Sequence, residues 1–151
     1  MTSGITVEQV APAQAGQAVA LLDRFFREEG FDTPFKGFAA SLEAMLTDSS
    51  CWVAVARDDE EIAGVVTVTT ALYVEWGRIG EIGDLYVLPG LRGRGVARAM
   101  IEAALAWCGA RGCSAVSVVV TPEGEQRYGL STFYGRLKFD PSGRTIMTRR
   151  L

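Results

Sequence analysis

Residues 84–97 read DLYVLPGLRGRGVA, and this stretch decides the fold because it joins a strand to a helix through glycines. The apolar residues at its start predict a strand over residues 79–88 that ends at Pro89-Gly90. The apolar stripe that follows predicts a long amphipathic helix over residues 95–110. A helix that begins directly after glycines leaves several backbone N–H groups free at its positively polarised end. The junction is therefore predicted to bind an anion such as phosphate.

The side chains of the junction support this interpretation. Gly93 and Gly95 allow the backbone to approach an anion closely, because neither residue carries a Cβ. Arg92, Arg94 and Arg98 add positive charge beside them. Two common phosphate loops are excluded, since G-x-x-x-x-G-K-[ST] is absent and G-x-G-x-x-G fails at position 98. A glycine turn whose arginines are ordinary surface charges is the alternative.

Hydrophobic periodicity along the rest of the chain predicts an α/β protein with a mixed sheet and helices on both faces. The run AVSVVV at 115–120 is nearly all apolar, which is typical of a strand buried on both faces. In chain order the expected elements are a strand at 5–10, helices at 12–29 and 38–46, strands at 51–56, 62–74 and 79–88, a helix at 95–110, a strand at 115–120, a helix at 132–137 and a strand at 139–148.

Length and composition restrict the function. The 151 residues are expected to form a single domain, 1–151. No histidine is present, which excludes Ser–His and Cys–His catalytic pairs and histidine-ligated metals, and no metal site is expected. A net charge of −3 argues against nucleic-acid or membrane partners, and no apolar run is long enough to span a bilayer. Cys51, Cys108 and Cys113 form no C-x-x-C pair, which favours buried reduced thiols and a cytoplasmic location.

Two motifs resemble the GNAT superfamily of N-acetyltransferases. The run Leu85-Tyr86-Val87, Pro89 and Arg92-x-x-Gly95-x-Ala97 resembles the family's acetyl-CoA signature, R/Q-x-x-G-x-G/A after a strand. Downstream, Phe133-Tyr134-x-x-Leu137-x-Phe139 resembles the family's F-Y-x-x-L-G-F. The chain departs from the usual pattern on the acceptor side, where Arg127, Gly135 and Lys138 replace a common Asn, Glu and Gly.

The resemblance implies a GNAT fold of the α+β kind, with a mixed, mostly antiparallel sheet of six to seven strands flanked by about four helices. It also implies acetyl-CoA as the acetyl donor. The pantetheine arm would pair with the backbone of Leu85-Tyr86-Val87 as an added strand, and the pyrophosphate would bind the following loop. The implied cofactor-binding residues are Leu85, Tyr86, Val87, Arg92, Gly93, Arg94, Gly95, Val96, Ala97 and Arg98.

The implied reaction is transfer of the acetyl group to a primary amine, which attacks only after losing its proton. By its place in the second motif, Tyr134 is the expected general acid for the departing sulfur. Two carboxylates are candidates for the base, Glu81 being slightly favoured over Asp84, and a site without a dedicated base stays open. Their positions along the strand differ in parity, which predicts that they point to opposite faces of the sheet.

By the same resemblance, the acceptor is expected against residues 25–40 and against the final strands. An acidic group there would attract a cationic amine, and aromatic side chains would add apolar contact; these are Glu28, Glu29, Asp32, Phe31, Phe35 and Phe38. Ordinary helix-end charges explain the acidic group equally well. A small-molecule amine is the expected acceptor, with a protein N-terminus or lysine as the alternative. A non-catalytic acyl-CoA sensor and a homodimer also stay open.

Overall fold

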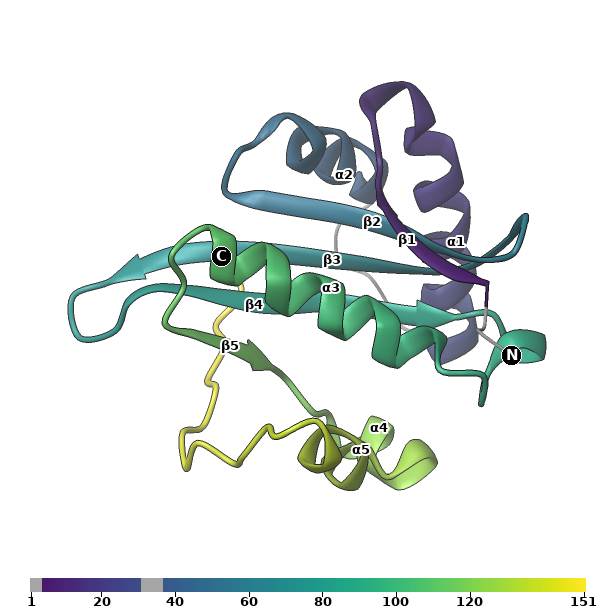
Figure 1. The fold of residues 1–151 in the computed structure, drawn as a ribbon. Coiled ribbons are helices and arrows are strands. Elements are labelled where there is room, and N and C mark those ends of the chain that lie inside the picture. Colours follow the sequence, from purple (N-terminus) through teal and green to yellow (C-terminus); the bar gives the residue numbers. More distant parts are fainter. Residues whose placement is uncertain (1–3, 31–36) are drawn as a thin grey trace. The chain divides into compact units, whose positions relative to one another are not determined.

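The computed structural model describes residues 4–30 and 37–151. Its chain divides into two compact units, Met1–Val118 and Val119–Leu151. The first unit holds a five-stranded sheet and three α-helices, and the second holds two short α-helices (Figure 1). Each unit is described by itself below.

The sheet of the first unit follows the order of the strands along the chain. Its members are β1 (Ile5–Gln9), β2 (Cys51–Asp58), β3 (Glu61–Tyr73), β4 (Gly77–Val87) and β5 (Ala115–Val118). Neighbours from β1 to β4 pair antiparallel, whereas β5 runs parallel to β4. The parallel pair follows from the helical crossover between β4 and β5, which returns the chain to the same end of the sheet.

Two helices cover one face of this sheet, as Figure 1 shows. Helix α1 (Ala15–Glu29) ends at Gly30, whose φ of 66° is the left-handed conformation that terminates helices, as the sequence predicts. Helix α2 (Phe38–Thr47) packs beside it. The apolar sides of both helices and the inward side chains of the strands form one core, made of Val10, Ala18, Leu21, Leu22, Leu42, Val53, Val55, Val65 and Tyr86.

Helix α3 (Val96–Ala110) covers the opposite face (Figure 1). It lies close to the strands at Gly64, where a Cβ would come 2.9 Å from the methyl carbon of Met100. Trp52 and Trp107 stack between β2 and α3 with their ring centroids 5.9 Å apart. Both tryptophans therefore serve packing, and the layered α/β architecture expected from the sequence is confirmed.

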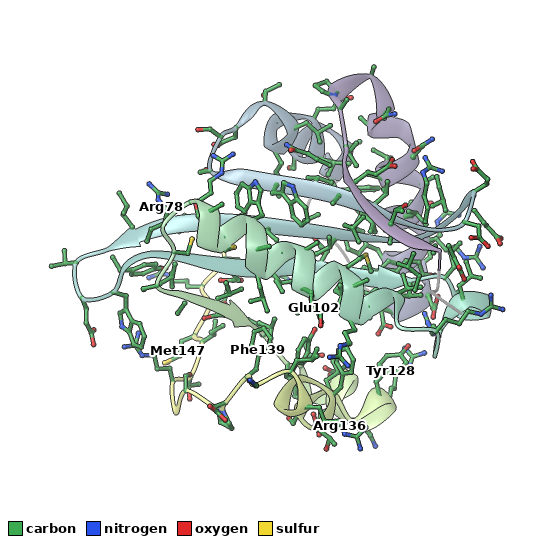
Figure 2. All side chains as sticks on the ribbon, viewed as in Figure 1. Arg78, Glu102, Tyr128, Arg136, Phe139 and Met147 are labelled. Carbon is green, nitrogen blue, oxygen red and sulfur yellow. The ribbon has the colours of Figure 1, made fainter. Side chains whose placement is uncertain are left out.

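The second unit contains α4 (Pro122–Tyr128) and α5 (Leu130–Arg136), joined at Gly129, whose φ is 59°. Tyr128 and Arg136 mark the ends of these two helices in Figure 2. Thr121 caps α4 by accepting a hydrogen bond from the Gly124 backbone N–H. Helix α4 was not expected, although the Thr-Pro start and the acidic first turn are a recognisable helix beginning.

Three expectations about the strands are wrong. The described residues contain five strands rather than six or seven, and the segment 139–148 forms no strand. Pro141 lacks a backbone N–H and Gly143 has a φ of 74°, so the segment is broken before it can pair. The run at 115–120 is not buried on both faces, because β5 is an edge strand in the described sheet and Val119 is half exposed.

The cysteines also differ in burial. Cys108 is fully buried, as expected, whereas Cys51 and Cys113 are half-buried, and all three are free thiols. Burial, followed by the neighbouring Cys113, raises the pKa of the Cys108 thiol to about 12. Among the helices in the described ranges, none combines the length and the apolar character that a bilayer crossing needs.

Candidate active site

The loop between β4 and α3 presents backbone donors, as the sequence predicts. A short 3-10 turn (Pro89–Leu91) precedes it. Gly93 and Gly95 have φ angles of 77° and 86°, and Gly95 is the N-cap of α3 with no side-chain cap. Across residues 4–30 and 37–151, no hydrogen-bond acceptor meets the backbone N–H groups of residues 93–98.

The space over this loop is open. A Cβ built on either Gly93 or Gly95 would meet no heavy atom within 4 Å. This open space lies beside the positive end of a 15-residue helix, whose N-cap is Gly95. Such an arrangement fits a diphosphate, which needs several donors and no side chain in the way.

The two arginines of the loop, and Arg98 in the first turn of α3, are each paired with a carboxylate. Arg94 lies 3.3 Å from Asp58 and Arg98 lies 2.9 Å from Glu102, whose side chain is labelled on α3 in Figure 2. Both pairs are largely exposed on the arginine side, so each contributes little to stability. A bound anion can therefore draw Arg94 and Arg98 away from their partners at small cost.

Arg92 is held more firmly than the other two arginines. Its guanidinium donates to Glu28 of α1 at 2.7 Å, and its Nε donates to the backbone carbonyl of Val87 at 2.9 Å. The same guanidinium lies over the ring of Tyr86, 5.6 Å from the centroid. Arg92 thus connects the end of β4 to α1.

The edge of β4 that faces β5 has a paired part and, after Ile82, a part that no described strand covers. Strand β5 pairs with β4 over Ile79–Ile82, and in the described chain the remaining residues of β4 pair with β3 alone. The Leu88 N–H donates to the carbonyl oxygen of Ala63 in β3. In a strand, the backbone N–H and C=O groups of successive residues point alternately to one neighbouring strand and to the other, so the direction at Leu88 fixes the directions at residues 85–87. The groups of Leu85 and Val87 point to the open edge, whereas those of Tyr86 point to β3.

A β-bulge interrupts β4 beside this edge. Asp84 pairs with Thr67 and Ile82 pairs with Val68, so Gly83 is one extra residue on β4. Glu81 pairs with Thr69, which is two residues from Thr67 on β3 and therefore on the same face. The bulge thus places Glu81 and Asp84 on one face of the sheet. The expectation that they point to opposite faces is wrong because it assumed an uninterrupted strand.

Asp84 and Glu81 differ in environment. Thr67 Oγ1 donates to Asp84 Oδ2 at 2.6 Å and accepts the Asp84 backbone N–H at 3.0 Å. Burial raises the pKa of the Asp84 carboxyl, and the hydrogen bond from Thr67 opposes part of that rise. Glu81 is exposed. Asp84 is therefore the more shielded of the two carboxyls, with a pKa raised by burial, as is common for groups at functional sites. No sequence signal identified Thr67 as its partner.

Tyr86 turns its side chain away from the open edge and toward α1. Its hydroxyl donates to Glu28 at 2.6 Å, and its ring centroid lies 5.1 Å from that of Phe25. Burial, and then the hydrogen bond to Glu28, raise the pKa of Tyr86. Glu28, which was expected to attract a cationic acceptor, accepts a hydrogen bond on each carboxylate oxygen, one from Tyr86 and one from Arg92.

The other predicted residues are described each within its own unit. Tyr134 belongs to the second unit, where it is buried on α5 between the rings of Phe133 and Phe139, at centroid distances of 5.2 and 5.5 Å. Burial raises the pKa of its hydroxyl. Phe31, Asp32 and Phe35 lie outside the described residues. Phe38 packs edge-on against Phe26. Among the residues whose placement is described, no three His, Cys, Asp or Glu side chains gather as metal ligands would.

A sequence model described as the acetyltransferase (GNAT) family matches residues 17–130. The chain belongs to this family. It is a GNAT acetyltransferase, and acetyl-CoA is its acetyl donor, as expected from the two motifs. The matched range includes β2 to β5 and the whole loop between β4 and α3.

Solved structures share the fold of this GNAT acetyltransferase. The aminoglycoside acetyltransferase AAC(6')-Iy, in complex with a bisubstrate analogue of CoA and acetylneamine, is 19% identical, with a TM-score of 0.82 and 99% of each chain covered. An aminoglycoside acetyltransferase from an uncultured soil metagenomic sample is 17% identical, with a TM-score of 0.80 and coverage of 98% and 96%. A ribosomal-protein-alanine N-acetyltransferase from Brucella melitensis biovar Abortus 2308 is 18% identical, with a TM-score of 0.75 and coverage of 97% and 99%. No curated protein sequence matches the chain.

Proposed function

We propose that this enzyme transfers the acetyl group of acetyl-CoA to a primary amine of a small molecule. The observation that carries the proposal is a combination along one stretch of chain: the carboxylate of Asp84 beside the bulge, the edge of β4 that β5 leaves open, and the N–H groups of residues 93–98, which meet no acceptor among the described residues. Similarity to enzymes named for aminoglycoside acetylation supports the small-molecule acceptor. The three free cysteines of this chain support a cytoplasmic site of action, since thiols stay reduced in the cytoplasm.

The donor would be held by main-chain groups. The peptide groups of Leu85 and Val87 would pair with the amide groups of the pantetheine arm, in the manner of an added strand. The N–H groups of Gly93, Arg94, Gly95, Val96, Ala97 and Arg98 would bind the diphosphate, and the side chains of Arg94 and Arg98 would add charge. Main-chain recognition of this kind explains why glycines dominate the motif.

We assign the base to Asp84. A primary ammonium with a pKa of about 10.4 is almost fully protonated at neutral pH, so the acceptor must lose a proton before or during attack. The raised pKa of Asp84 makes its carboxylate a better proton acceptor than an ordinary aspartate. Glu81, on the same face but exposed, is the second candidate, and it could act through a water molecule.

We assign the acid to Tyr134. As the amine nitrogen bonds to the acetyl carbon and the carbon–sulfur bond breaks, the sulfur takes up a proton. Burial raises the pKa of the Tyr134 hydroxyl, so it remains protonated at neutral pH and has a proton to give. A thiolate leaves readily even without help, so the expected contribution of the acid is modest, about ten- to a hundredfold.

A panel assay tests the proposal. Release of CoA is followed with a thiol reagent while aminoglycosides, simple diamines and peptides with a free N-terminus or lysine are offered in turn. Turnover is expected with at least one small amine and is expected to fall in Asp84→Asn more than in Glu81→Gln. Turnover with peptides alone would instead support a protein acceptor. Binding of acetyl-CoA without turnover on any amine would identify a non-catalytic sensor.

A further inference from the structure

We infer that Glu28 is a positioning residue for acetyl-CoA, because it joins the Tyr86 hydroxyl and the Arg92 guanidinium into one cluster at the start of the donor-binding loop. The inference rests on the proposed binding of the donor to this loop. Glu28 does not touch the donor itself but acts through Arg92.

Both carboxylate oxygens of Glu28 are used. Oε1 accepts from Arg92 at 2.7 Å, and Oε2 accepts from the Tyr86 hydroxyl at 2.6 Å. The Glu28 and Arg92 side chains are only 23% and 36% exposed, so this pair is better shielded than the other two pairs of the loop. A carboxylate with two short charge-assisted hydrogen bonds fixes both partners in direction as well as in distance.

The orientation of Arg92 matters because of its second bond. Its Nε donates to the carbonyl of Val87 at 2.9 Å, at the edge of β4 that β5 leaves open. That hydrogen bond connects Val87, the last residue of β4, to Arg92, the residue that begins the glycine loop. The spacing between the peptide groups of Leu85 and Val87 and the N–H groups of residues 93–98 is thereby set before any ligand arrives.

Loss of Glu28 should therefore act on donor affinity. Gly93 and Gly95 allow the loop many conformations, and a loop without its anchor must be ordered when acetyl-CoA binds. The chemical step depends on Asp84 and Tyr134 and should change little once the donor is saturating. This split between affinity and turnover is the signature of a positioning role.

A double-mutant cycle with glutamine at position 92 gives the sharpest test. Glutamine at this position carries its amide nitrogen the same number of bonds from the backbone as the Nε of arginine, so it can keep the bond to Val87 without needing a carboxylate. Glu28→Gln should weaken acetyl-CoA binding about tenfold in the wild-type background, since a neutral amide holds the Arg92 guanidinium less firmly than a carboxylate does. In the Arg92→Gln background the same change should cost less than twofold.

Calorimetry with acetyl-CoA provides the affinities, and kcat at saturating donor should stay within about twofold for Glu28→Gln. Asp23→Asn is the matched control, because it removes a carboxylate from the same helix and breaks only the exposed pair with Arg27. Thermal melts check that each variant is folded.

Three results would overturn the inference: equal losses from Glu28→Gln in both backgrounds, no loss in the wild-type background, or a loss in kcat rather than in affinity. Binding of acetyl-CoA by the wild-type protein but not by Gly95→Asp would support the donor site itself. In that case, any of the three results above refutes only the role of Glu28. If the wild-type protein does not bind acetyl-CoA, the proposed function fails together with the inference.

Discussion

Replacing Gly95 separates the cost of backbone strain from the cost to donor binding. With a φ of 86°, Gly95 occupies a conformation that costs a residue with a Cβ about 1–2 kcal/mol. A Cβ there meets no atom within 4 Å, so strain is the whole expected effect of Gly95→Ala on the free energy of unfolding. Gly109, in the last turn of the same helix, also has open space but no positive φ. Gly109→Ala should therefore stabilise the protein by about 0.5–1 kcal/mol.

Binding of acetyl-CoA should respond differently to the same positions. Gly95→Asp places a negative charge among the N–H groups that we assign to the diphosphate. Repulsion of about 2 kcal/mol, a reasonable value for like charges near a protein surface, corresponds to about a 30-fold loss of affinity. Gly109→Ala should leave the affinity unchanged, since it lies at the other end of α3.

Urea unfolding and calorimetry with acetyl-CoA, on the same preparations, measure the two effects. Equal shifts in stability for the two alanine variants would contradict the strain argument. Wild-type affinity in a folded Gly95→Asp variant would refute the assignment of the diphosphate to this loop.

Three further results are expected. Asp84→Asn should lower kcat at least tenfold yet stabilise the protein at neutral pH. Burial raises the pKa of the folded carboxyl, so the wild-type protein loses stability as the pH rises from about 4 through that pKa. Urea unfolding should show the stability advantage of the variant growing over that pH range and vanishing below it. Tyr134→Phe should lower kcat about ten- to a hundredfold with an unchanged Kd for acetyl-CoA, and a changed Kd with a normal kcat would argue against an acid role. Gly64→Ala should cost about 1–3 kcal/mol in urea unfolding, because its Cβ would lie 2.5 Å from the Tyr86 carbonyl and 2.9 Å from Met100, and wild-type stability would contradict that packing.

The sequence predicts features whose causes are local. The glycines around 93–95, the apolar stripe of α3 and the stop at Gly30 each depend on neighbouring residues, and each is found where the pattern places it. The N–H groups of residues 93–98 meet no acceptor among the described residues for the same reason, because the first N–H groups of any helix have no partner within that helix.

Features that depend on a partner strand or helix were not predictable in this way. The bulge at Gly83 is set by the register with β3. It brings Glu81 and Asp84 to one face of the sheet, whereas in a regular strand their spacing would place them on opposite faces. The segment 139–148 has strand-like alternation, but its backbone pairs with no other strand in the described residues. Glu28 meets Tyr86 and Arg92 across 58 and 64 residues, a contact that composition and spacing cannot reveal.

The central claim is that the N–H groups of residues 93–98, in the glycine loop and the first turn of α3, bind the diphosphate of acetyl-CoA, and amide NMR measures these groups directly. On titration with acetyl-CoA, the amide resonances of Gly93, Gly95, Val96 and Ala97 should show the largest downfield shifts in the protein, saturating at the Kd found by calorimetry. Saturable binding that leaves these four resonances in place, with the large shifts elsewhere, would contradict the account.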